Sequence, residues 1–60
     1  METFNVWDKV SVTLDDGKAY AGMILSYDDN ADPVVYAVSV IQTQTVVFGT
    51  QSELTITAIS

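Results

Sequence analysis

Hydrophobic and polar residues alternate along much of this chain, which is the pattern of half-buried β-strands. The clearest case is the segment 10–14, where apolar residues at every second position alternate with Ser11 and Thr13. Four further apolar-rich runs follow at 19–27, 34–41, 45–48 and 54–59. The pattern therefore predicts five short strands and leaves almost no room for a helix.

Short polar segments predict where the strands end. Asp15-Asp16-Gly17-Lys18 has the composition of a hairpin turn, because Gly17 can adopt the positive φ that Asp-Gly turns require. The stretch 28–33 ends in Pro33, which has no N–H for a strand ladder, and we expect a loop there. Residues 42–44 predict a tight reversal, Gly49 the end of the fourth strand, and residues 50–53 a single 3₁₀ turn.

Apolar residues on both faces of the second run set it apart from the first. Alternation places Tyr20, Gly22 and Ile24 on one face and Leu25 and Tyr27 on the other. Gly22, inside the strand, predicts a point of sharp curvature. Because a small barrel cannot cover both faces of such strands, an uncovered face predicts self-association or docking on a larger assembly. The strand at 46–48 offers an open edge that can accept a strand from a partner.

Length and composition restrict the class of protein. Sixty residues, 48% of them apolar, predict a single domain over 1–60, with 1–7 as a lead-in segment. The absence of Cys and His from the sequence excludes disulfides, thiolate chemistry and the commonest zinc ligand. The sequence shows no leader pattern and no run near the roughly 20 apolar residues of a membrane span. We therefore expect a cytoplasmic protein that does not bind membranes.

Charge is the second informative property. Eight Asp and Glu residues face two Lys and no Arg, which gives a net charge of −6. Binding to a phosphate backbone depends on Lys and Arg that displace counterions, so the composition disfavours nucleic acid as a partner. A protein partner with a basic surface fits the sign better. If that partner itself binds nucleic acid, the carboxylates would take the places of phosphates.

Several segments together resemble the SH3-like small barrels, a group that includes KOW, Tudor and Sm-type modules and a small photosystem I accessory subunit. The segments are Asp8-Lys9-Val10, the turn at 15–18, Gly22-Met23-Ile24, Tyr36-Ala37-Val38 and Ser52-Glu53-Leu54. The resemblance covers residues 8–59 and lies in the patterning, with no diagnostic motif. It implies an all-β fold, a five-stranded SH3-like small barrel with a single 3₁₀ turn before the last strand. The first loop is too short for a polyproline-binding site, so no specific family function carries over.

Two clusters of carboxylates are candidate sites of chemistry. Asp15 and Asp16, with Glu53 or Asp8, form candidate pairs for acid–base catalysis, but such pairs need a pocket that moves their pKa values apart. Turn formation accounts for Asp15 and Asp16 without catalysis. The second cluster, at 28–32, is rich in oxygen ligands but lacks the Gly and closing Glu of a calcium-binding EF-hand loop. We therefore predict no enzyme activity, no catalytic residue, no metal and no cofactor.

The aromatic residues are the remaining candidates for contact with a partner. Two or three of them are expected to fill the interior, and Trp7 is expected to cap an opening of the barrel. An exposed Tyr or Trp ringed by Asp would be a hot spot for a basic surface. The predicted partner-binding residues are Trp7, Tyr20, Tyr27, Tyr36, Asp15, Asp16, Asp28, Asp29 and Asp32.

These observations predict a small acidic, non-enzymatic protein–protein interaction module that binds a basic protein surface. We expect an accessory protein of phage or bacterial origin. The alternative is a structural or assembly subunit of a larger complex, or a homo-oligomer, held by apolar burial. Sensitivity to salt separates the two, because ion pairs at a surface are screened and apolar contacts are not.

Overall fold

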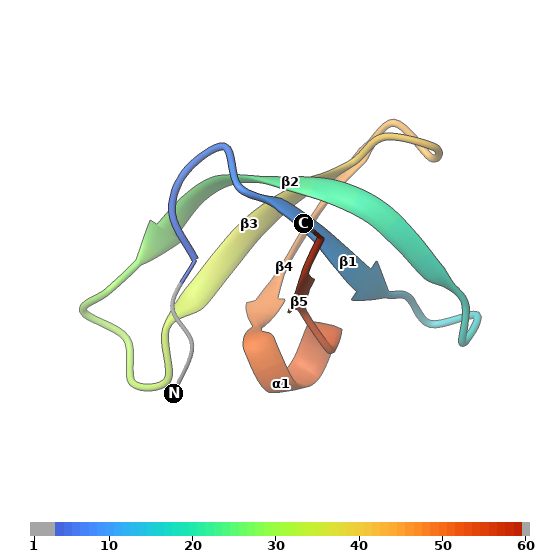
Figure 1. Cartoon of the computed structure of the whole chain (residues 1–60). Coiled ribbons are helices and arrows are strands. Elements are labelled where there is room, and N and C mark those ends of the chain that lie inside the picture. The colour runs from blue at the N-terminus through green and yellow to red at the C-terminus, as the bar shows by residue number, and fades with distance from the viewer. Residues whose placement is uncertain (1–3, 60) are drawn as a thin grey trace.

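Five antiparallel strands form one sheet in the computed structural model, which describes residues 4–59 (Figure 1). The elements are β1 (Lys9–Thr13), β2 (Ala19–Asp28), β3 (Val35–Val40), β4 (Thr45–Thr50), a single helical turn α1 (Gln51–Leu54) and β5 (Thr57–Ala58). Their order across the sheet is β4-β3-β2-β1-β5. The all-β prediction is confirmed, and the first three strands lie close to their expected positions.

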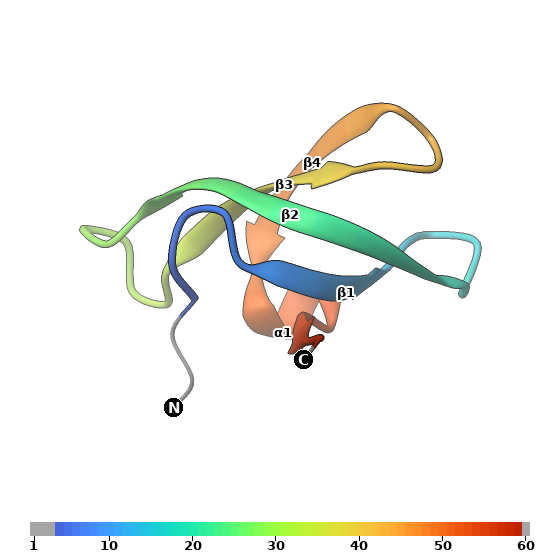
Figure 2. The same ribbon diagram turned by 45° about the horizontal axis from the view of Figure 1, so that its top comes forward.

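β2 is the longest strand and joins the two halves of the sheet. Its first part pairs with β1, where Gly22 lies opposite Val10, and its second part pairs with β3. The register with β3 shifts between Ile24 and Ser26, which leaves Leu25 as the extra residue of a β-bulge. A bulge bends a strand and increases its twist. The sheet accordingly curls over α1 in both views (Figures 1 and 2).

The bulge corrects one prediction made from alternation. Strict alternation puts Tyr27 on the face away from Ile24, together with Leu25. The structure instead sets Tyr27 opposite Tyr36, with the two ring centroids 6.3 Å apart. Side chains along a strand change face at every step, so one extra residue reverses the alternation beyond it.

The hydrophobic core lies on the face of the sheet toward α1, where Phe4 also packs. Its buried side chains are Phe4, Val10, Val12, Ile24, Tyr36, Val38, Val40 and Ile56. Phe4 packs edge-on against Tyr36, with centroids 5.5 Å apart, and its N–H donates to the Tyr36 hydroxyl at 3.3 Å. Full burial of an aliphatic side chain contributes about 1.5–3 kcal/mol, so this cluster is the main source of stability.

Gly22 allows β3 to approach β2 closely. A Cβ atom at this position would lie 2.7 Å from Val38 Cγ1 and 3.0 Å from the Ser39 carbonyl oxygen. Both distances are too short for a normal contact. Glycine in the middle of a strand often marks such an approach of another backbone.

The C-terminal third differs from the prediction. β4 passes through Gly49 and ends at Thr50, the turn after it is α-helical, and Leu54 ends that turn where a strand was expected to begin. The last strand is reduced to Thr57–Ala58. β4 and β5 lie at opposite ends of the strand order, so the sheet is not a closed barrel.

Candidate functional site

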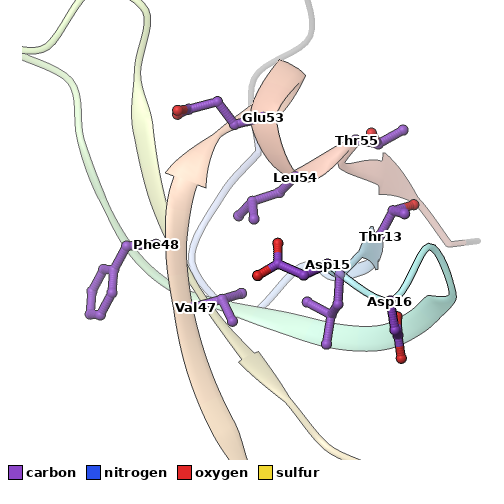
Figure 3. A pocket seen from close by; sticks show the side chains of 9 residues that line it. Thr13, Asp15, Asp16, Val47, Phe48, Glu53, Leu54 and Thr55 are labelled. Carbon is purple, nitrogen blue, oxygen red and sulfur yellow. The ribbon is translucent and has the colours of Figure 1, made fainter.

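An open groove of about 640 Å³ lies between the β1–β2 turn and the segment formed by β4 and α1 (Figure 3). Its lining residues come from two distant parts of the chain: Thr13, Leu14, Asp15, Asp16, Val47, Phe48, Glu53, Leu54 and Thr55. Three of them are apolar residues packed against the core and three are carboxylates. Asp15 and Leu54 point into the space, and Phe48 projects from the opposite side of β4 to Val47.

The β1–β2 turn forms as the sequence predicts. The Gly17 N–H donates to the Leu14 carbonyl at 2.9 Å, and the Leu14 N–H donates to the Lys18 carbonyl at 3.1 Å. Gly17 has a φ of +79°, which glycine adopts without a steric penalty. This tight closure fixes Asp15 and Asp16 at the edge of the groove.

Asp16 is held by two hydrogen bonds from its own hairpin. The Lys18 N–H donates to Asp16 Oδ1 at 2.9 Å, and the Tyr20 hydroxyl donates to Asp16 Oδ2. The Tyr20 bond is the main cause that lowers the pKa of Asp16, and the Lys18 bond adds to it. The same contact raises the pKa of Tyr20, because the hydroxyl donates to a carboxylate. Tyr20 thus holds a carboxylate in place and is not free to contact a partner through its hydroxyl.

Glu53 is fixed by the start of α1. The Thr50 hydroxyl accepts from the Glu53 N–H at 3.2 Å, and the Glu53 carboxylate accepts from the Thr50 N–H at 2.9 Å. This reciprocal pair is a capping box, and it explains why a helical turn forms at this point. The bond from the Thr50 backbone is the main cause that lowers the pKa of Glu53.

Asp16 and Glu53 both favour their ionised forms. The pKa values of Asp16 and Glu53 are both lowered, so both groups are ionised at neutral pH. A general acid needs a raised pKa, and acid–base pairs need two values moved apart. Among residues 4–59, no group of three or more Asp, Glu, His or Cys side chains is placed to hold a metal ion. The groove therefore places the Asp15 carboxylate beside an apolar floor, with Asp16 and Glu53 fixed at its rim.

Trp7 lies outside the groove, and the structure corrects its expected role. It does not cap an opening, since 67% of its surface is exposed. It occupies the third position of a turn closed by the Asp8 N–H on the Asn5 carbonyl at 3.1 Å, with a φ of 75°. The backbone N–H of Trp7 donates to the Ile24 carbonyl at 2.7 Å. A positive φ at this position normally selects Gly, so an exposed Trp held there is a strained arrangement.

The other predicted binding residues are dispersed. Tyr36 is only 2% exposed and belongs to the core, which removes it from any contact surface. Tyr27 is half exposed beside it. The three acidic residues of the stretch 28–33 are Asp28, Asp29 and Asp32. They lie at the other end of β2 from Asp15 and Asp16. The structure thus brings together only Asp15, Asp16 and, through its bond, Tyr20.

Several exposed apolar residues were not among the predicted binding residues. Phe48 is 71% exposed, and Ile41 and Val46 are also exposed. The pairs Ala37–Phe48 and Ser39–Val46 place both β4 side chains on the face away from the core. Val38 is buried and pairs with Val47, so the neighbours of Val47 on the strand must point to the opposite, exposed face. The exposure of residues 46 and 48 can therefore be inferred once the register of the hairpin is known. That register, however, is a property of the fold.

Comparisons with known proteins assign the chain to no family. No family model and no curated protein matches the sequence, and no solved structure matches the fold. Within the described part of the chain, no helix has the length and apolar character needed to cross a membrane.

Proposed function

We propose that this chain is a non-enzymatic protein-interaction module of SH3-like architecture, whose acidic groove binds a Lys- or Arg-bearing segment of a protein partner. The observation that carries the proposal is the groove itself, where Asp15 points into a space floored by Leu14, Val47 and Leu54, while Asp16 and Glu53 line its rim with their carboxylates turned outward (Figure 3). The one five-stranded antiparallel sheet and the helical turn before its last strand support the architecture.

Electrostatics favour a cationic ligand. The chain carries a net charge of −6, and its charge is concentrated in short segments that include both walls of the groove. Because hydrogen bonds hold Asp16 and Glu53 in place, little side-chain freedom is lost when a cation binds. The field also attracts a basic surface during the encounter and raises the association rate.

Apolar contact has to supply much of the affinity. Exposed ion pairs contribute little individually because water and salt screen them. The floor formed by Leu14, Val47 and Leu54 offers a surface for the aliphatic parts of Lys and Arg side chains. Their charged groups can stay in solvent at the edge of the groove. Each methylene removed from water contributes about 0.8 kcal/mol. A ligand with basic residues on long stems therefore fits both parts of the groove.

The direct test uses a short synthetic peptide of alternating Lys and Val, with an alternating Glu and Val peptide as the control ligand. We expect the Lys peptide to shift the amide resonances of the groove residues in a nuclear magnetic resonance titration. The double variant Asp15→Asn with Glu53→Gln should weaken binding, and Gln at position 53 keeps the capping box. The matched control is Asp28→Asn with Asp29→Asn, which removes the same charge at the far end of β2.

Two results would contradict the proposal. One is equal loss of affinity in the two double variants, since the total charge and not the groove would then decide binding. The other is an affinity that stays constant between about 0.05 and about 0.5 M salt, a range in which the screening length falls severalfold.

A second candidate function, self-association, is favoured by one observation. Residues 33–52 contain no charged side chain, although ten charged residues occupy the rest of the chain. The hairpin of β3 and β4 in this stretch exposes Ile41, Val46 and Phe48. Sedimentation velocity separates the two functions: a stable oligomer whose mass is unchanged by salt favours assembly, and a monomer favours the groove.

A further inference from the structure

We propose that the ligand of the groove binds as an extended strand that adds to the free edge of β4, with its basic side chains toward Asp15 and its alternate, apolar side chains beside Phe48. This inference rests on the proposed function, because it specifies how the basic segment is held. It defines the ligand as a short segment in which Lys or Arg alternates with apolar residues.

The groove lies beside a strand at one end of the sheet. Two of its lining residues, Val47 and Phe48, belong to β4, which stands at one end of the strand order. Within residues 4–59, β4 pairs with β3 only. A strand at the end of a sheet presents a row of backbone N–H and C=O groups that can pair with another chain. The groove therefore runs along an unused hydrogen-bonding edge.

The free edge of β4 lacks the usual protection against pairing with another chain. Proteins block free edges with charged side chains, Pro or bulges. β4, with the sequence Thr-Val-Val-Phe-Gly-Thr, has no charge and no Pro, and its register with β3 is unbroken from Thr45 to Thr50. The outer part of the β3–β4 hairpin also stands clear of the other elements in both views (Figures 1 and 2).

The two faces of β4 present different surroundings to an added strand. Val47 and Phe48 project from opposite sides of the strand, Val47 toward the groove and Phe48 away from it (Figure 3). A strand added beside β4 has the same alternation, so one set of its side chains faces the groove and the other lies beside Phe48 and Val46. The groove side carries Asp15, whereas the other side carries Phe48, 71% of which is exposed, and the exposed Val46.

Charge complementarity selects the occupant. A second copy of the chain would bring a further charge of −6 to a groove already lined by Asp15, Asp16 and Glu53. Like charges close together oppose binding, whereas a cationic segment is attracted. An uncharged apolar strand would leave the Asp15 carboxylate without a partner. Alternating basic and apolar residues satisfy both sides of β4.

The test uses the alternating Lys and Val peptide in three forms: unmodified, N-methylated at its Val residues, and N-methylated at its Lys residues. Successive amides of a strand point to opposite edges, so each methylated form blocks one edge only. We expect one methylated form to bind at least about tenfold more weakly, a difference of about 1.4 kcal/mol, and the other to bind like the unmodified peptide. Amides on the free edge of β4 should exchange hydrogen more slowly when the unmodified peptide is bound.

The outcomes separate the two proposals. If the unmodified peptide does not bind, the proposed function fails. If it binds and the two methylated forms lose equal affinity, or neither loses any, the strand-addition inference fails while the groove remains the binding site. A free chain that sediments as a dimer, and stays a dimer with the unmodified peptide in excess, would show that a second copy occupies the edge and would also overturn the inference.

Discussion

The Tyr20 hydroxyl donates a hydrogen bond to the carboxylate of Asp16 across the β1–β2 turn. The two residues are four positions apart, and the Gly17 turn between them brings the phenol over the acid. A residue expected to contact a partner therefore acts on its neighbour. It fixes one of the three carboxylates of the groove and favours its ionised form.

Removal of the Tyr20 hydroxyl tests this relationship. In Tyr20→Phe the pKa of Asp16 should rise toward its ordinary range, because the largest cause of its lowered value is gone. A carboxyl whose pKa is lowered by folding adds stability above its unfolded pKa and loses it as the pH falls through the folded value. The variant should thus be less stable at neutral pH, and the difference should shrink below about pH 4. A pH titration of the Asp16 carboxyl carbon by nuclear magnetic resonance measures the shift. Tyr27→Phe, at the other end of β2, is the control, and an unchanged Asp16 titration in Tyr20→Phe would contradict the assignment.

Gly22→Ala should destabilise the fold by about 1–3 kcal/mol, the usual cost of overpacking. The new methyl group would meet Val38 at 2.7 Å and the Ser39 carbonyl oxygen at 3.0 Å, and the backbone cannot move away without disturbing the β2–β3 ladder. Gly49→Ala is the comparison, since its Cβ would approach only the Leu54 side chain, at 3.0 Å. Denaturation by urea, followed by circular dichroism, gives both values. A larger loss for Gly49→Ala would show that the close approach at Gly22 is not the limiting contact.

Trp7→Gly should leave stability unchanged or raise it by about 1 kcal/mol. Glycine relieves the left-handed conformation, which costs other residues roughly 1–2 kcal/mol, and its own entropic cost of roughly 0.5–1 kcal/mol offsets part of that gain. The lost burial is small because 67% of Trp7 is exposed. Circular dichroism is the suitable probe, since the variant has no Trp for fluorescence. A loss of stability of more than about 1.5 kcal/mol, the lower end of the range for burying a large apolar side chain, would show that Trp7 packs against the rest of the protein.

Thr50→Ala should lower stability by about 0.5–2 kcal/mol through loss of the helix cap. The pKa of Glu53 should rise in part, because the Thr50 side chain is the second cause of its lowered value, whereas the main cause, the bond from the backbone N–H of residue 50, is kept. The loss should therefore be larger at neutral pH than in acid, where protonated Glu53 no longer gains from the cap. Thr50→Ser keeps the hydroxyl and serves as the control. Equal stability of the Ala and Ser variants would rule out the capping box as the reason for the helical turn.

The strands of the first half could be predicted from sequence because their signal is local. Val10 and Val12 alternate with polar residues, and the Gly17 turn has a composition with one structural meaning. Tyr27 could not be placed in this way, since the bulge at Leu25 forms only when β2 pairs with β3. The helical turn had a local signal that was missed, because Thr50 and Glu53 have the spacing of a capping box.

The groove could not be predicted without knowledge of the fold. Asp15 could be recognised as part of a turn, but nothing near it in the sequence indicates that Val47 and Leu54 lie across from it. Those residues reach the turn through three strand pairings, and each pairing register depends on packing between distant residues. Sequence patterns therefore identified an acidic turn, whereas the apolar floor beside it emerged only from the structure.

The curvature of β2 has a mechanical consequence for recognition. One wall of the groove follows β1 and the other is β4, and β2 and β3 span the distance between them in the strand order. Flattening of this span would move the walls apart, and tighter coiling would bring them together. We therefore expect the bulge at Leu25, a residue that does not line the groove, to influence the width available to a ligand.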